Sequence, residues 1–176
     1  MQISQTVTIG IPVFNEASYI EQVISNFLNQ EYPHLVEILV ADGGSTDNTR
    51  DIVREITKNN PKVKLLHNPK KNQSYALNLM VKEAKGDIFL RADAHCEYAS
   101  DYIEQCVKSL LSSQALSVGG AQRFVAKTAF QAGVALSARS VLGNGGAKYR
   151  DSNYSGFADT VFMGCFWRKA LLDISG

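Results

Sequence analysis

Short apolar runs alternate with amphipathic helical patterns along the first two-thirds of this chain. The runs are typical of buried strands and lie at residues 7–11, 36–41, 63–66 and 88–90. Apolar stripes with helical spacing follow them, at residues 20–28, 46–58, 77–84 and 103–111. Strands that alternate with helices indicate βαβ units. We therefore predict an α/β fold with a doubly wound, mostly parallel sheet and helices on both faces.

Several helix ends carry their own signals. Ser18 and Glu21 have the spacing of a capping box, and Ser100 is placed to cap the helix that follows it. Gly86 is placed to stop the third helix.

The pattern weakens after residue 124. Residues 128–142 look helical, residues 143–156 read as a long exposed loop, and residues 160–166 as a strand. We predict one α/β half at residues 1–124. The remaining residues, 125–176, would be the incomplete start of a second half, so we expect the chain to be a fragment of a longer protein.

Composition excludes several classes of protein. The net charge is +1 and the basic residues are scattered, which argues against a nucleic-acid partner. The three cysteines are odd in number and lack C-x-x-C spacing, which argues against a disulfide framework or a zinc site and favours the cytosol. We find no signal peptide and no stretch of about 18 apolar residues.

Acidic residues directly follow three of the predicted strands. Glu16, Asp42 and Asp93 come after the first, second and fourth apolar runs, and His95 lies two residues beyond Asp93. Loops that follow parallel strands gather at one edge of the sheet, where ligands bind. Asp93 and His95 could share Mg²⁺ or Mn²⁺ with a diphosphate. The alternatives are a turn-capping Asp93 beside a surface histidine, and a structural ion pair between Asp93 and Arg91.

The other candidates also have structural alternatives. Asp42 could bind a base or ribose, or form an Asx turn with the backbone after it. Glu16 could reach a ribose hydroxyl or only favour the helix N-terminus. The polar segment 70–73 could meet an anion at a helix start or be a solvated loop. We expect residues 45–47 to cap the second helix.

Known nucleotide-binding and hydrolase motifs are absent from the sequence. It contains no G-x-x-x-x-G-K-[ST], no G-x-G-x-x-G after the first strand and no G-x-S-x-G. A nucleotide would therefore need a cation to neutralise its phosphates. Cys106 lies on the apolar stripe of its helix, and we predict that it is a core residue.

Four stretches, taken together, resemble the inverting family-two glycosyltransferases of the GT-A fold. They occur in the family's order and lie at residues 11–16, 40–49, 72–78 and 84–95. The resemblance covers roughly residues 6 to 124 and implies a nucleotide-diphosphate sugar donor, usually a UDP-sugar, bound with Mn²⁺ or Mg²⁺. It makes residues 1–124 the donor-binding half and residues 125–176 the start of the acceptor-binding half.

The resemblance also assigns residues to the donor. The residues implied to bind it are Pro12, Phe14, Glu16, Asp42, Lys71, Gln73, Asn78, Arg91 and Asp93. Asp93 and His95 would hold the metal. The family more often has aspartate where this chain has His95, and a neutral imidazole favours Mn²⁺ over Mg²⁺.

The implied reaction transfers a sugar to a hydroxyl acceptor, saccharide or lipid-linked, in polysaccharide or cell-envelope glycan synthesis. In the family, the catalytic base is an acidic residue in a downstream motif, and we expect this motif beyond Gly176. Within the chain, Asp159 is the one nearby carboxylate that we consider for the base. We therefore expect the chain to bind the donor but to transfer little sugar.

We expect a cytoplasmic location, and residues 128–142 could also make peripheral contact with a membrane. The alternatives are a non-catalytic nucleotide-sugar-binding module and a nucleotidyltransferase.

Overall fold

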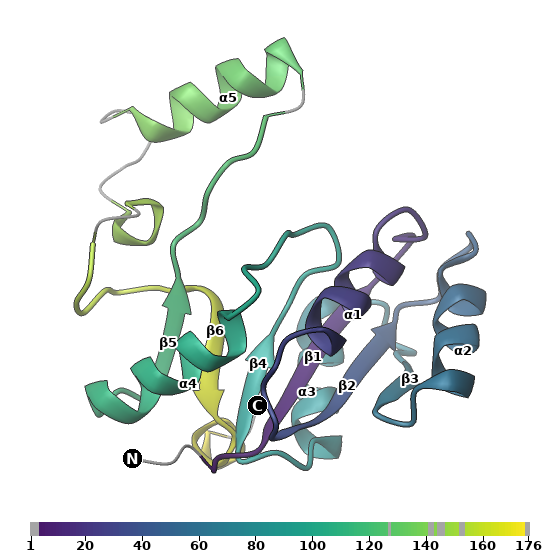
Figure 1. Ribbon diagram of the computed structural model, residues 1–176. Helices are drawn as coiled ribbons and strands as arrows, with labels where there is room; N and C mark the ends of the chain where they lie inside the picture. The colour runs from purple at the N-terminus through teal and green to yellow at the C-terminus, as the bar shows by residue number, and fades with distance from the viewer. Residues whose placement is uncertain (1–3, 127, 141–142, 144–146, 152–153, 175–176) are drawn as a thin grey trace. The chain divides into compact units, whose positions relative to one another are not determined.

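The computed structural model describes residues 4–126, 128–140, 143, 147–151 and 154–174 (Figure 1). Strands and helices alternate through the first half of the chain. In chain order the elements are β1 (Val7–Val13), α1 (Ile20–Leu28), β2 (Leu35–Asp42), α2 (Thr49–Asn59), β3 (Val63–His67), α3 (Gln73–Glu83), β4 (Ile88–Arg91), α4 (Tyr102–Ser113), β5 (Ser117–Gly120), α5 (Ala129–Arg139), the 3-10 turn η1 (Lys148–Arg150), β6 (Phe162–Trp167) and α7 (Arg168–Asp173).

The strands form one six-stranded sheet in the order β3-β2-β1-β4-β6-β5. Strands β1 to β4 pair in parallel, whereas β6 runs antiparallel to β4. Val13 at the end of β1 pairs with Asp42 at the end of β2, so the loops after these strands leave from the same edge. The predicted mostly parallel α/β sheet is confirmed.

Apolar side chains cover both faces of the sheet. On one face, α1, α2 and α4 pack against a core in which Ile9, Ile38 and Leu90 are fully buried. On the other face, α3 packs against Leu39 and Phe89. Figure 1 shows α1 and α4 in front of the sheet and α3 behind it. Cys106 of α4 is buried in the first core, as its place on the helical stripe predicted.

The chain divides into two compact units. One contains residues up to Val118 and from Cys165 onward, and the other contains residues 119–164. The second unit includes α5, η1 and the first part of β6. The division into donor-binding and acceptor-binding halves at residue 124 stays a prediction.

The helix ends correct three expectations. The cap of α1 is Tyr19, which makes no side-chain capping bond, so the predicted capping box of Ser18 and Glu21 is not formed. The cap of α4 is Asp101 rather than Ser100. α3 already ends at Glu83, before it reaches Gly86.

Gly86 instead allows two backbone segments to approach each other. Its N–H donates to the Thr8 hydroxyl at 2.9 Å. A Cβ at this position would lie 2.6 Å from the backbone nitrogen of Thr8 and 2.8 Å from the carbonyl carbon of Val7. The turn before β4 therefore needs a residue without a side chain because β1 lies directly against it.

Glu37 is a buried carboxylate in β2, with 2% of its side chain exposed. It accepts hydrogen bonds from the Thr8 hydroxyl at 3.0 Å and the Lys85 N–H at 2.7 Å, and it forms an ion pair with Lys64. Burial raises the pKa of Glu37, but these hydrogen bonds outweigh burial and the pKa is lowered overall. The ionised carboxylate thus stabilises the contacts between β2 and its neighbours.

We expect stability to fall in acid partly through Glu37. Because its pKa is lower in the folded than in the unfolded chain, its contribution is complete above the unfolded value of about 4 and is lost as the pH falls through the folded-state pKa. Glu37→Gln should cost about 2 kcal/mol at pH 7 and less at pH 3. Urea unfolding at several pH values measures this. Equal losses at pH 7 and pH 3 would contradict it.

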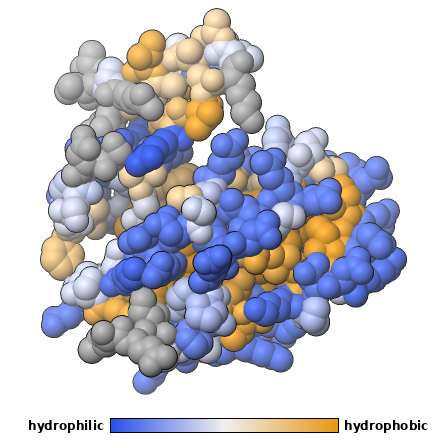
Figure 2. Space-filling view, viewed as in Figure 1, coloured by the Kyte–Doolittle hydropathy of each residue, from blue (hydrophilic) through white to orange (hydrophobic). Residues whose placement is uncertain are grey.

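Apolar side chains are exposed on α5, where Phe130 is 82% and Leu136 is 70% exposed. Figure 2 shows apolar and weakly polar residues over this helix, whereas polar residues predominate over the face that carries α1, α2 and α4. In the described part of the chain, no helix combines the length and apolarity that crossing a membrane requires. The peripheral membrane contact considered for residues 128–142 stays a prediction, and residues 141 and 142 lie outside the described part.

Candidate nucleotide-binding site

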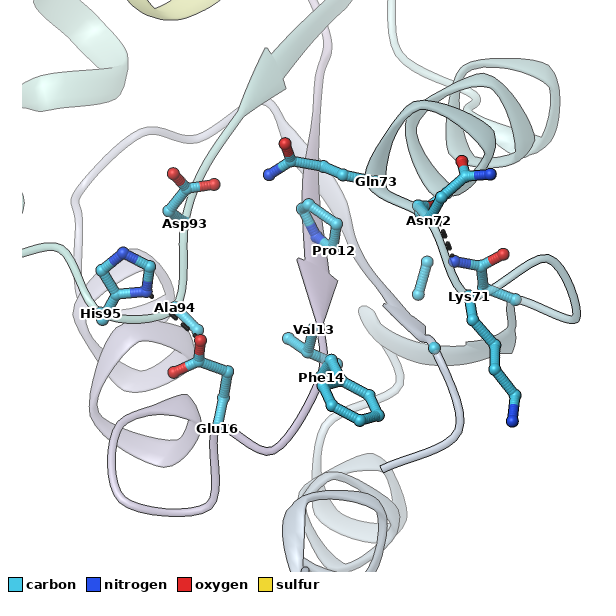
Figure 3. Close-up of a pocket in the computed structure, with 14 residues that line it drawn as sticks. Pro12, Val13, Phe14, Glu16, Lys71, Asn72, Gln73, Asp93, Ala94 and His95 are labelled. Atoms are coloured by element: carbon cyan, nitrogen blue, oxygen red, sulfur yellow. Dashed lines mark hydrogen bonds and ion pairs between the residues drawn. The ribbon is translucent and has the colours of Figure 1, made fainter. Parts of the chain in front are cut away.

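A cleft of about 190 Å³ opens at the carboxyl edge of β1, β2 and β4, beside the start of α3 (Figure 3). Its floor is mostly apolar and its rim carries charged and amide groups. The residues that line it are Pro12, Val13, Phe14, Glu16, Ala41, Gly43, Asn68, Lys71, Asn72, Gln73, Ala76, Asp93, Ala94 and His95. An apolar floor with a few convergent polar groups is typical of a small-molecule site.

The loops after β1 and β2 are bonded to each other. Asn15 adopts a left-handed conformation with φ of 57°. Its N–H donates to the Ser45 hydroxyl at 2.9 Å, and its side-chain oxygen accepts from the Thr46 N–H at 2.8 Å. The Glu16 N–H donates to the Thr49 hydroxyl at 2.8 Å. These contacts fix the backbone that carries Phe14 and Glu16 into the cleft.

These bonds change the role expected for residues 45–47. The cap of α2 is Asn48, which makes no side-chain capping bond. Asp47 accepts from the N–H of Thr49 at 3.0 Å, but it also accepts from the N–H of Ala17 at 3.1 Å. The expected capping of α2 is therefore partly replaced by bonds to the first loop.

Asp42 forms the Asx turn that the sequence offered as one alternative. Its carboxylate is 2% exposed and accepts from the N–H groups of Gly44 at 2.9 Å and Ser45 at 3.2 Å. Gly44 has φ of 85°, which favours glycine. Asp42 is not among the residues that line the cleft, although its neighbours Ala41 and Gly43 are. Its contact with a nucleobase stays a prediction.

The loop before α3 contributes amides and a lysine. Asn68 is buried, donates from its side chain to the Asn72 carbonyl at 2.9 Å and accepts from the Lys70 N–H at 3.2 Å. Asn72 caps α3 by accepting from the Tyr75 N–H at 2.7 Å. Lys71 has φ of 55°, and within the described chain it forms no salt bridge. A lysine without an acidic partner beside a helix N-terminus suits an anion.

The loop after β4 carries the acidic and imidazole groups. His95 Nδ1 lies 3.3 Å from Glu16 Oε1, so the first and fourth loops meet at these side chains. Asp93 Oδ1 lies 3.6 Å from Arg91 Nη2, as the ion-pair alternative predicted. Figure 3 shows Gln73 extending from α3 toward Asp93 across Pro12.

The donor set suits a cation that arrives with a ligand. In the ranges that the structure describes, no group of three or more His, Cys, Asp and Glu side chains could hold a metal alone. Asp93 and His95 offer one carboxylate and one imidazole at the rim of the cleft. Mg²⁺ and Mn²⁺ in nucleotide sites commonly take one or two protein ligands and complete their shells with phosphate oxygens and water. The residues present fit this arrangement.

The structure brings most of the predicted site residues together. Those that line the cleft are Pro12, Phe14, Glu16, Lys71, Gln73, Asp93 and His95. Asp42, Asn78 and Arg91 are outside the lining set. Asn72 was expected only as part of the polar segment 70–73, and Asn68 was missed. Asn68 precedes Pro69, and an Asn-Pro pair at a strand end is a turn signal that could have indicated it.

The sequence profile described as "Glycosyl transferase family 2" matches residues 8–172, which is nearly the whole chain. The chain belongs to glycosyltransferase family 2. This confirms the resemblance drawn from the four sequence stretches.

Curated relatives share this family's sequence pattern. The chain is 43% identical to the "Succinoglycan biosynthesis protein ExoA" of Rhizobium meliloti (strain 1021) over 144 residues, covering 81% of this chain and 44% of the relative. It is 31% identical over 173 residues to the "Dolichyl N-acetyl-alpha-D-glucosaminyl phosphate 3-beta-D-2,3-diacetamido-2,3-dideoxy-beta-D-glucuronosyltransferase" of Methanococcus voltae, covering 94% of this chain and 54% of the relative. The chain thus spans about half the length of these relatives.

Solved structures confirm the GT-A-like fold. The mannosyltransferase PcManGT from Pyrobaculum calidifontis, solved with GDP-Man and Mn²⁺, is 25% identical with a TM-score of 0.76, covering 99% of this chain and 48% of that one. The S. aureus TarS fragment solved with UDP is 18% identical with a TM-score of 0.71, covering 97% of this chain and 49% of that one.

Proposed function

We propose that this family-two chain binds a nucleotide-diphosphate sugar together with a divalent cation and serves as the donor-binding part of an inverting glycosyltransferase. The observation that carries the proposal is that Asp93, His95 and Gln73 line the same cleft at the carboxyl edge of the sheet as Lys71, which lies on the side away from Asp93 (Figure 3). Opposite charges on two sides of an apolar floor suit a cation–diphosphate pair attached to a flat base.

Each end of the cleft has a role in this proposal. The exposed ring of Phe14 and the amide of Asn68 lie where a nucleobase or ribose would fit, with Pro12 on the floor. Lys71 would bind a phosphate oxygen through its ammonium group. We propose a UDP-sugar as the first donor to test, because the family resemblance implies uridine; PcManGT was solved with GDP-mannose.

Asp93 and His95 are the residues that would hold the cation. Once bound, Mn²⁺ or Mg²⁺ would act as a Lewis acid that neutralises charge on the leaving diphosphate. Glu16 Oε1 lies beside His95 Nδ1 and can accept a hydrogen bond from the Nδ1–H group, which would leave Nε2 to coordinate the cation. An imidazole in this set favours Mn²⁺ over Mg²⁺.

The proposed acceptor is inferred from the family and from the named relatives. We propose a saccharide or lipid-linked hydroxyl as the acceptor, in polysaccharide or cell-envelope glycan synthesis, since one relative is named for succinoglycan biosynthesis. Asp159 is exposed within residues 119–164 and remains the weak candidate for a catalytic base. Cys96, Cys106 and Cys165 are free thiols, which supports a reducing compartment such as the cytosol.

Calorimetric titration tests the donor side. We expect one nucleoside diphosphate from a panel of UDP, GDP, ADP and CDP to bind in the presence of Mn²⁺, with binding at least about tenfold weaker after chelation with EDTA. The corresponding nucleoside should bind more weakly and without a metal requirement, because it lacks the diphosphate. Binding of all four nucleotides with equal affinity, unaffected by EDTA, would contradict the proposal.

A further inference from the structure

The backbone of the turn that follows β4 is hydrogen-bonded to the side-chain hydroxyl of Tyr98. The Asp93 N–H donates to the Tyr98 hydroxyl at 2.7 Å, and this hydroxyl donates to the Asp93 carbonyl oxygen at 3.3 Å. The Cys96 N–H donates to the same carbonyl at 3.3 Å. Both backbone polar groups of Asp93 are therefore bonded within the turn, and Tyr98 bonds to both of them.

Tyr98 is in turn anchored in the core. Its ring centroid lies 4.6 Å from that of Phe27 in α1 and 5.2 Å from that of Tyr102 in α4. Phe27 is fully buried. The Asn26 side chain donates to the Tyr98 carbonyl at 3.2 Å.

A buried glutamine joins the two helices that hold the ring. Gln30 donates to the Asn26 side-chain oxygen at 3.1 Å and accepts from the Ile103 N–H at 3.0 Å. This chain of bonds links α1, the start of α4 and the Tyr98 backbone. The Tyr98 ring is thus held rigidly by the core, and its hydroxyl fixes the backbone of the turn.

The side chains that leave this turn make fewer contacts than its backbone. His95 is 61% exposed and contacts Glu16 at 3.3 Å, and the charged contact described for Asp93 is with Arg91, at 3.6 Å. Their direction therefore depends on how the backbone of the turn is held. Without the Tyr98 hydroxyl, the Asp93 N–H would lose its partner and the turn could rotate. The other end of the cleft, at Phe14 and Asn68, belongs to different loops and would be unaffected.

We propose that Tyr98 is a positioning residue, whose hydroxyl holds the turn so that Asp93 and His95 face the cation and diphosphate. This inference rests on the proposed function, because it assigns the turn to donor binding. It predicts a loss confined to the diphosphate end of the ligand. A general loss of folding would instead affect both ends alike.

The test uses Tyr98→Phe, which removes the hydroxyl and keeps the ring. We expect the preferred nucleoside diphosphate with Mn²⁺ to bind about tenfold more weakly, whereas the corresponding nucleoside keeps its affinity within twofold. Amide hydrogen exchange, measured without ligand, should show lost protection at Asp93. Tyr102→Phe is the matched control, because it removes a hydroxyl from the neighbouring ring, and it should change neither result.

Unchanged diphosphate binding in Tyr98→Phe, or an equal loss for nucleoside and diphosphate, would overturn the positioning role. Unchanged exchange at Asp93 would overturn the anchoring of the turn. If the wild-type protein binds no nucleoside diphosphate, the proposed function fails and the donor role of Tyr98 fails with it. Hydrogen exchange still reports in that case whether Tyr98 holds the turn.

Discussion

Asp93→Asn should remove cation-dependent nucleotide binding, with a loss of about a hundredfold or more in affinity. Asparagine keeps the shape of the side chain but removes the negative charge that a divalent cation requires. The substitution also removes the charged partner of Arg91, whose Nη2 lies 3.6 Å from Asp93 Oδ1 in the wild-type chain. Titration with the preferred nucleoside diphosphate and Mn²⁺ measures the loss, and thermal unfolding shows whether the fold is retained.

Asp101→Asn is the matched control for this experiment. Asp101 follows the same strand but is exposed, and its carboxylate accepts from the Gln105 side chain at 2.9 Å at the start of α4. The same loss of charge at this position should leave nucleotide affinity within about twofold. An Asp93→Asn protein that binds Mn²⁺ and nucleotide as tightly as the wild type would refute the assignment of Asp93 to the cation.

Gly86→Ala should lower the free energy of unfolding by about 3 kcal/mol. The new methyl group would lie within 3 Å of the backbone of β1, and a backbone cannot move aside as a flexible side chain can. Relief requires β1 and the turn before β4 to separate, at the centre of the sheet. Trp167 is the single tryptophan and pairs with Ile88, so its fluorescence during urea unfolding reports on this region.

Gly133→Ala provides the opposite case. A Cβ at Gly133 in α5 would have no other atom within 4 Å, and alanine favours a helix over glycine by about 0.5–1 kcal/mol. This variant should be as stable as the wild type or slightly more stable. If Gly86→Ala unfolds at the same urea concentration as Gly133→Ala, the close contact between the turn and β1 does not limit stability.

The sheet could be predicted because its central strands are buried on both faces. Such strands read as nearly continuous apolar runs, and β1, β2 and β4 do so, although Thr8 interrupts the run in β1 and Glu37 the run in β2. β5 was missed because its four residues, Ser117–Gly120, include two glycines and lack an apolar run. α7 was missed because it follows β6 directly, with no turn residues to separate them.

From the sequence, only those site residues that directly follow a predicted strand could be located. Glu16, Asp93 and His95 were located because each follows a buried strand, and parallel strands bring their ends to one edge. The bonds of Asn15 to Ser45 and Thr46 join residues about thirty positions apart and leave no local pattern in the sequence. The anchoring of the turn by Tyr98 depends on packing against α1, which periodicity does not show.

The chain leaves the sheet after β5 and returns through β6, and these two strands are neighbours. The segment between β5 and β6 therefore begins and ends at adjacent positions in the sheet. Closing a flexible excursion costs free energy that grows only with the logarithm of its length. A segment anchored in this way can be lengthened, shortened or exchanged at little change in free energy, while the rest of the sheet keeps its shape.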